Sequence, residues 1–175
     1  MESVLFPSGV LSELYSVPVE GGREKQILST PALSAKYSAD GNSIVFYDRK
    51  GYEDDYRKHH VSSVTRDIWM YNFPEKKYTK LTEWRGEDRE PVWGNENQVY
   101  FTSEQSGSFN VWKGTISGDS FTNLKQVTNL DTHPVRSLSR ADNGMLCFRY
   151  DGEIYKMLEP NEPQKVNITI RSDRR

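Results

Sequence analysis

The sequence lacks several features on which whole classes of proteins depend. It has one cysteine, Cys147, so no disulfide can form within its 175 residues. It has no run of about 18 apolar residues, which excludes a membrane-spanning helix. Its charges are mixed, with a formal net charge of −2, and this gives no support for nucleic-acid binding, which needs a clustered basic face. No segment of ten or more residues has a helical period, so we expect a chain built from strands.

Catalytic signatures are missing as well. The serines and threonines include no Gly-x-Ser-x-Gly elbow, and the sequence contains no His-Glu-x-x-His pair and no glycine-rich phosphate loop. We therefore expect no catalytic residue and no cofactor in this chain.

The sequence is rich in aromatic residues, with 4 Trp, 10 Tyr and 7 Phe. It also contains a short repeated motif. Each copy is a polar residue, an aliphatic residue and a large aromatic residue. The four copies are Glu13-Leu14-Tyr15, Asp67-Ile68-Trp69, Asn110-Val111-Trp112 and Glu153-Ile154-Tyr155. The aliphatic positions are separated by 54, 43 and 43 residues. A period of this length indicates one supersecondary unit copied along the chain.

One unit reads as four strands. A first strand with a nearby proline leads through a tight turn to an apolar second strand, the repeated motif forms the third, and a polar alternating segment forms the fourth. Proline can begin a strand but lacks the N–H that a central position needs. The prolines concerned are Pro31, Pro91 and Pro134. In the third strand, alternation predicts that Ile68 and Met70 face one side and Trp69 and Tyr71 the other, so both faces of the sheet are apolar.

Four strands in about 40–45 residues is the length of a propeller blade. We therefore predict an all-β fold: a β-propeller of four-stranded antiparallel blades, of which residues 1–175 hold about three and a half to four. The predicted blades span 3–29 (incomplete), 30–83, 89–128 and 133–170. Closed propellers have about four to eight blades. We therefore expect a portion of a longer protein, with open blade faces through which it can self-associate.

Two families resemble this sequence. The blade motif Tyr37-Ser38-Ala39-Asp40-Gly41-Asn42-Ser43-Ile44-Val45-Phe46, with its Leu-Thr strand ends, resembles TolB-type propeller repeats. A narrower resemblance, to the N-terminal propeller of tricorn-like serine peptidases, lies in residues 50–69 and 86–93 and in the C-terminal 166–175. Its most specific segments are Lys50-Gly51-Tyr52-Glu53-Asp54-Asp55-Tyr56-Arg57-Lys58-His59-His60 and Gly86-Glu87-Asp88-Arg89-Glu90-Pro91-Val92-Trp93.

The second resemblance implies a large multidomain peptidase with two propellers, a small peptide-binding module and a catalytic domain near its C-terminus. The family's catalytic serine and its partners lie in that last domain, which no segment here matches, so no catalytic role is carried over. For this chain the resemblance implies a non-catalytic propeller that guides or binds peptides and frames the assembly. The compartment stays open between bacterial periplasm and cytoplasm.

Two alternatives remain. One is a TolB-type scaffold that binds another protein and serves no protease. The other is a propeller hydrolase with a site at the channel mouth, which the missing catalytic residues argue against.

Residues 51–65 account for the longer first spacing, because 54 exceeds 43 by 11 residues. This insert joins the second and third strands of one blade, and loops on rigid scaffolds often carry function. We predict that Arg57, Lys58, His59 and His60 anchor a peptide carboxylate through charge-assisted hydrogen bonds. The plain alternative is a solvated loop, or one packed on another domain.

Other candidate sites have simpler explanations. His59 and His60 lie near Asp54 and Asp55, but adjacent histidines rarely chelate one ion, so we predict no metal site. Recurrence of Asp67 and Glu153 at one repeat position favours a structural role, such as accepting hydrogen bonds from turn amides, over acid–base chemistry. The repeat-matched tryptophans are expected in the core; they are Trp69, Trp93 and Trp112.

Overall fold

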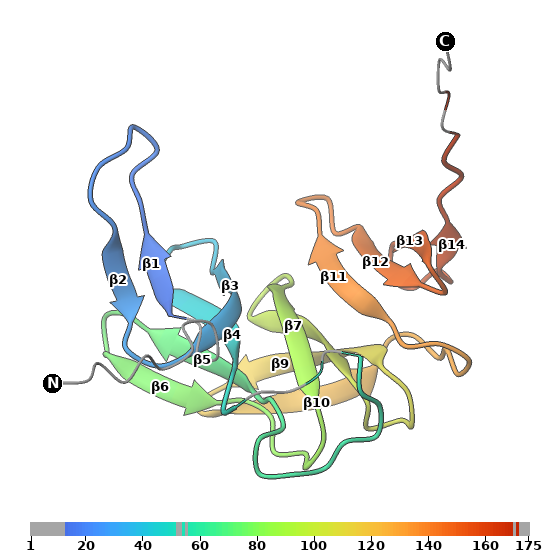
Figure 1. The fold of residues 1–175 in the computed structure, drawn as a ribbon, viewed down its shortest axis with the longest axis horizontal. Coiled ribbons are helices and arrows are strands. Elements are labelled where there is room, and N and C mark those ends of the chain that lie inside the picture. Colours follow the sequence, from blue (N-terminus) through green and yellow to red (C-terminus); the bar gives the residue numbers. More distant parts are fainter. Residues whose placement is uncertain (1–12, 52–53, 55, 170, 172–175) are drawn as a thin grey trace, which may run out of the picture.

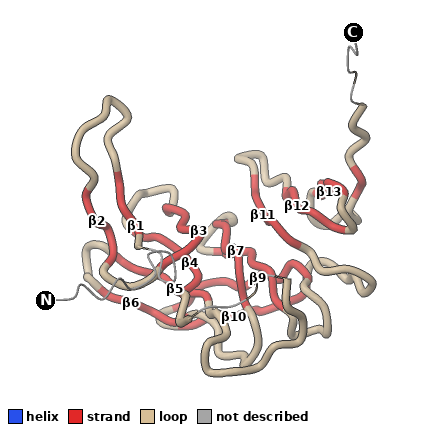
Figure 2. Tube along the Cα trace, in the orientation of Figure 1, coloured by secondary structure: helices blue, strands red, loops and turns tan. Residues whose placement is uncertain are grey.

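The computed structural model describes residues 13–51, 54, 56–169 and 171, and residues 3–12 of the first predicted blade lie outside this part. The described residues form strands and loops and no helix, as Figure 2 shows. No helix that could cross a bilayer is therefore found among them. The prediction of an all-β fold is confirmed.

The strands form one two-stranded and three four-stranded antiparallel sheets, each a meander in chain order. We call these sheets blades 1 to 4. Blade 1 holds β1 (Leu14–Ser16) and β2 (Lys25–Leu28). Blade 2 holds β3 (Ala32–Tyr37), β4 (Ser43–Asp48), β5 (Ile68–Asn72) and β6 (Lys77–Lys80). Blade 3 holds β7 (Asp88–Trp93), β8 (Gln98–Ser103), β9 (Asn110–Ser117) and β10 (Ser120–Gln126). Blade 4 holds β11 (Arg136–Arg140), β12 (Leu146–Tyr150), β13 (Glu153–Met157) and β14 (Gln164–Lys165).

The blades follow one another around an open arc, from blue blade 1 to red blade 4 (Figure 1). The first strands of successive blades are neighbours, because β7 contacts both β3 and β11. This arrangement is a partial β-propeller of about four blades, as the repeat predicted.

Apolar side chains from both faces of a blade fill the spaces between blades. Ile68 and Met70 pack with Phe101 of blade 3, whereas Trp69 and Tyr71 pack with Leu28 of blade 1. The alternation predicted for the third strand is therefore confirmed, and one strand supplies two different cores. A third core joins blades 3 and 4 around a shared set of buried side chains that includes Val111, Leu138 and Phe148.

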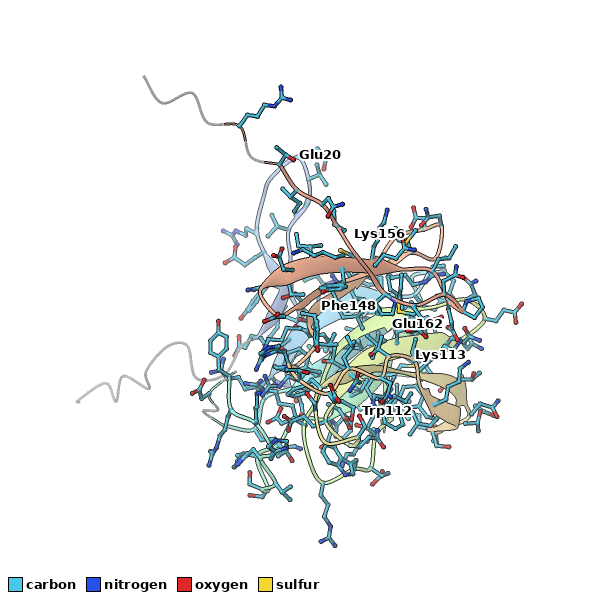
Figure 3. The ribbon with its side chains drawn as sticks, turned by 90° about the vertical axis from the view of Figure 1, so that its right-hand side faces the viewer. Glu20, Trp112, Lys113, Phe148, Lys156 and Glu162 are labelled. Carbon is cyan, nitrogen blue, oxygen red and sulfur yellow. The ribbon has the colours of Figure 1, made fainter. Side chains whose placement is uncertain are left out.

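The outer side of blade 4 has no neighbour in this arc. Figure 3 views the molecule from that side and labels Phe148 and Lys156 of blade 4 with Trp112 and Lys113 of blade 3. Ile154 is 38% exposed there, whereas Phe148 of the same blade is buried in the core shared with blade 3.

Each first strand carries a bulge that the sequence did not predict. The pairing register shifts within β3, β7 and β11, and at each shift a residue has positive φ: Ser34 (51°), Glu90 (54°) and Ser137 (57°). Pro91 lies inside β7 rather than before it. An edge strand tolerates proline at a bulge, because no ladder hydrogen bond is needed there.

In blades 2 and 3, a threonine that follows the fourth strand accepts a backbone N–H of the third strand. The hydroxyl oxygen of Thr82 accepts a hydrogen bond from the Ile68 N–H (3.0 Å), and that of Thr128 accepts from the Val111 N–H (2.9 Å). The Thr128 hydroxyl also donates to Asn110 Oδ1 (2.9 Å), which accepts the Leu130 N–H as well (2.8 Å). These hydrogen bonds explain why threonine follows the end of the fourth strand in blades 2 and 3.

The first position of the repeat plays different structural roles in different blades. Asn110 accepts from a loop amide, as predicted for this position, but Asp67 and Glu153 pair with lysines instead. Lys50 Nζ and Lys80 Nζ lie 2.5 and 3.2 Å from Asp67 Oδ2, and Lys165 Nζ lies 2.7 Å from Glu153 Oε1.

The repeat-matched tryptophans are partly buried rather than fully enclosed. Each packs against a core, and Trp69 Nε1 donates to Asp48 Oδ2 (3.0 Å) and Trp93 Nε1 to the Lys36 carbonyl (2.9 Å).

A polar cluster also joins blades 3 and 4. Glu159 accepts hydrogen bonds from Tyr100 (2.8 Å), Lys113 (2.7 Å) and Lys125 (2.8 Å). Burial alone would raise the pKa of Glu159, but these donors outweigh burial and lower the pKa to about 2.

Candidate functional site

The insert, residues 51–65, connects β4 to β5 and is the teal segment below β7 in Figure 1. Strand direction alternates within each blade, so the loops β4–β5, β8–β9 and β12–β13 all lie at the same end of the blades. The insert shares this end with two much shorter loops, and a long loop there can reach its neighbours.

Contacts of the insert extend over two further blades. The His59 N–H donates to Glu104 of the β8–β9 loop, with N···Oε2 of 3.0 Å. The ring of Tyr56 lies 5.1 Å from the guanidinium carbon of Arg136, the first residue of β11. A segment that begins in blade 2 therefore contacts blades 3 and 4. It is held at both positions by polar and cation–π contacts rather than by apolar packing.

The structure places the four predicted anchoring residues on this insert. Arg57, Lys58 and His59 are exposed, and His60 is partly buried. The turn that presents them is closed by Asp54, whose side chain accepts the Tyr56 N–H (2.9 Å) and whose carbonyl accepts the Arg57 N–H (3.1 Å). Asp55 lies outside the described residues. Within the described part, no three His, Cys, Asp or Glu side chains are placed to hold a metal ion.

Charged residues lie buried close to the insert, between blades 2 and 3. Arg66 and Glu87 are 2% and 0% exposed. Arg89 Nε donates to Glu87 Oε2 (2.8 Å), and Arg66 Nη1 lies 4.0 Å from the same oxygen. Both guanidinium groups also lie over rings, Arg66 over Tyr47 and Arg89 over Phe109. Buried charges need such partners, because desolvation is costly.

Asp88 lies next to this pair and is fully buried. Burial raises the pKa of Asp88 to about 7, against the smaller lowering effect of the Ser103 and Thr82 hydroxyls. Those hydroxyls are near, but neither carboxylate oxygen is in hydrogen-bonding geometry with a described residue. A carboxyl group in this state binds a proton readily.

Burial likewise raises the pKa of Glu104, against the lowering effect of the His59 N–H. The Glu104 carboxyl group, which accepts the His59 N–H of the insert, is therefore harder to ionise than an exposed glutamate.

Two hollows flank the insert. One, of about 340 Å³, is lined by Ser62, Thr65, Lys80 and Arg85 among others. The other, of about 230 Å³, lies between Tyr56 and blade 4. We call the second one the blade 4 cavity. Its wall consists of Tyr56, His133, Pro134, Arg136, Arg149, Tyr150, Asp151 and Gly152.

Sequence reasoning found the insert but missed its partners. Tyr56 pairs with Arg136 and His59 with Glu104 across 80 and 45 positions, and no local motif marks such pairs. The buried charges Arg66, Glu87 and Arg89 did stand in the stretches that resemble the tricorn-like propeller, but the sequence assigned them no role.

Comparisons with known proteins support the same fold. The family model of the tricorn protease N-terminal beta propeller domain matches residues 5–163. A crystal structure of the tricorn protease is similar with a TM-score of 0.74 at 19% identity, covering 95% of this chain and 15% of that chain. A putative TolB from Agrobacterium tumefaciens is similar with a TM-score of 0.71 at 16% identity, covering 89% of this chain and 56% of that chain. A search of curated proteins finds no match.

The structural likenesses, at these identities, show the fold alone, and this chain spans only part of either neighbour. The family match extends over the repeat, the insert, blades 1 to 3 and blade 4 as far as β13. The chain therefore belongs to the family of tricorn protease N-terminal β-propeller domains.

Proposed function

We propose that this propeller is a non-catalytic scaffold that guides peptides, and that the insert anchors the peptide's terminal carboxylate. The observation that carries the proposal is the exposed basic run Arg57, Lys58 and His59 on a loop held against two neighbouring blades. A fixed loop loses less entropy on binding than a free one, so its charges can serve as an anchor.

The chemistry of the run suits a carboxylate. Arginine offers a planar fork of donors that matches a carboxylate, and lysine adds a charge on a flexible stem.

The whole protein is proposed to be longer than this chain. The chain spans 15% of the tricorn protease chain to which it is similar, so hydrolysis would belong to another domain and this propeller would deliver or hold peptides. A TolB-type scaffold for a protein partner is the second candidate, because the fold is about as similar to the putative TolB.

Binding of two matched peptides tests the proposal. A short neutral peptide with a free C-terminus and the same peptide with a C-terminal amide are titrated against the chain, with calorimetry as the readout. We expect the free carboxylate to bind about tenfold more tightly, the value of one charge-assisted hydrogen bond. The double variant R57Q/K58Q should remove this difference.

The control variant is R23Q, which removes a charge from the exposed β1–β2 loop of blade 1. It should keep the preference. Equal binding of the two peptides to the unmodified chain would contradict carboxylate anchoring and would favour the protein-scaffold candidate.

A further inference from the structure

The blade 4 cavity is small and joins the insert to blade 4. Its volume of about 230 Å³ falls below the roughly 300–1,000 Å³ of sites that enclose whole ligands. A space of this size suits one side chain of a larger ligand.

Two arginines face this cavity from directly opposite positions. Arg136 of β11 and Arg149 of β12 are register partners in the antiparallel pair. Like charges placed opposite each other destabilise a sheet. The pair therefore carries a cost that an anion between the two guanidinium groups would relieve.

The two guanidinium groups are not equally available. Arg136 is half-buried, with rings of Tyr56 and Phe109 5.1 and 5.9 Å from its guanidinium carbon. Burial and the neighbouring Arg89 lower the pKa of Arg136. Arg149 is exposed, and its side chain has no hydrogen bond or ion pair within the described part of the chain.

Acidic groups near the cavity are already engaged. Asp151 lies 3.1 Å from His133 Nε2. Glu90 accepts the N–H groups of Ser137 and Leu138, at 2.9 and 3.0 Å. A carboxylate of a ligand would thus give Arg149 a charged partner that the described part of the chain does not supply.

We propose that the blade 4 cavity receives an acidic side chain, Asp or Glu, of a peptide bound at the insert, with Arg149 as its main partner. This rests on the proposed function, because Tyr56 in the cavity wall directly precedes Arg57 of the anchoring run. Arginine pairs with a carboxylate through two parallel hydrogen bonds, and the rings of Tyr56 and Tyr150 flank the site. The propeller thus selects peptides with an acidic residue close to the C-terminus.

The test places one glutamate in turn at each of the four positions before the C-terminus of a neutral peptide, and compares each peptide with its glutamine version. At one position we expect glutamate to bind five- to tenfold more tightly. R149Q should abolish this preference and keep the dependence on the terminal carboxylate. R57Q/K58Q should do the reverse, and R23Q should change neither.

A second probe separates the two proposals. N-acetylglutamate amide carries the acidic side chain without a terminal carboxylate, and its binding is followed by NMR shifts of the Arg136 and Arg149 side chains. Shifts that R149Q removes support the cavity even if peptide anchoring fails. Three results would overturn the cavity proposal. The first is the absence of both a glutamate preference and an NMR shift, and the second is a glutamate preference that persists in R149Q. The third is that inorganic phosphate displaces the glutamate peptide at a lower concentration than N-acetylglutamate amide does.

Discussion

At the scale of single residues, the buried charges between blades 2 and 3 are the most unusual feature. Arg66, Glu87 and Asp88 are almost completely removed from solvent, and a hydrophobic replacement of a buried ion pair is often no less stable. Their presence links the stability of the fold to its protonation state.

Asp88 should make the protein less stable as pH rises. The pKa of Asp88 is about 7 in the folded chain and about 3.9 in an unfolded one. The folded state therefore binds more protons between these values, and the free energy of unfolding should fall by roughly 2–4 kcal/mol from pH 4.5 to pH 7.5. Urea denaturation across this range measures the slope, which D88N should largely remove.

The comparison of the unmodified chain with D88N separates the contribution of Asp88 from those of other acidic groups. The raised pKa of Glu104 acts in the same direction and persists in D88N, whereas Glu159, with its pKa lowered to about 2, acts at lower pH. Exposed Asp142 supplies the control D142N. If D88N and the unmodified chain fell in parallel, Asp88 would not be the group that titrates.

Glu90 is predicted to hold blade 4 against blade 3. Its two oxygens accept two N–H groups of the β11 bulge. E90A should lower the free energy of unfolding by about 2–3 kcal/mol, and E90Q, which keeps one acceptor, by about 1 kcal/mol. Both keep a Cβ at the positive φ of this position, so backbone strain cancels in the comparison. Urea denaturation measures both, with E162A at an exposed site as reference; identical curves for all three would refute the role.

At the scale of elements, the recurring layout of the blades comes from short polar anchors as much as from apolar alternation. Thr82 follows β6 and Thr128 follows β10. Their hydroxyl oxygens accept the backbone N–H groups of Ile68 and Val111, near the start of the third strands. Asn167 occupies the same position, two residues after the end of β14, so a polar side chain recurs there.

Removing this anchor should destabilise its blade. T128V keeps the shape of the side chain but leaves the Val111 N–H without its acceptor, whereas Asn110 Oδ1 keeps the Leu130 N–H. We expect a loss of about 1–3 kcal/mol, the cost of buried unsatisfied polar groups, measured by thermal and urea unfolding. T132V, at an exposed loop position, should change stability by less than about 0.5 kcal/mol. A similar small change in T128V would show that water replaces the hydroxyl.

The sequence predicted what depends on local periodicity. Alternation assigned Ile68 and Met70 to one core and Trp69 and Tyr71 to the other, and the repeat spacing located the insert. It could not predict the bulges, because Ser34 and Ser137 have positive φ although serine is not a residue type that signals this conformation. Nor could it bring Arg136 and Arg149 to one cavity, since their pairing depends on a bulge in β11.

At the scale of the whole molecule, the open side of blade 4 has the strongest consequence. Ile154 remains exposed on a sheet whose other face is packed, and proteins normally cover such apolar surfaces.

The chain by itself is therefore predicted to associate. Light scattering at micromolar concentration should give the mass of a dimer or larger species, because two open faces can bury each other. The variant I154E should shift the mass towards that of one chain, and K156E, on the same strand, should not. A monomer at all concentrations would mean that the arc covers its own ends.

The bulges of β3, β7 and β11 also bear on the proposed passage of a peptide along the first strands of the blades. A straight edge strand offers a regular row of free N–H and C=O groups, to which an extended peptide adds as a further strand whatever its sequence. A bulge breaks that row and turns the strand away. Under the proposed function, three successive interruptions would leave no regular edge for strand addition, so a peptide would slide past these strands and be recognised by its side chains and its C-terminus.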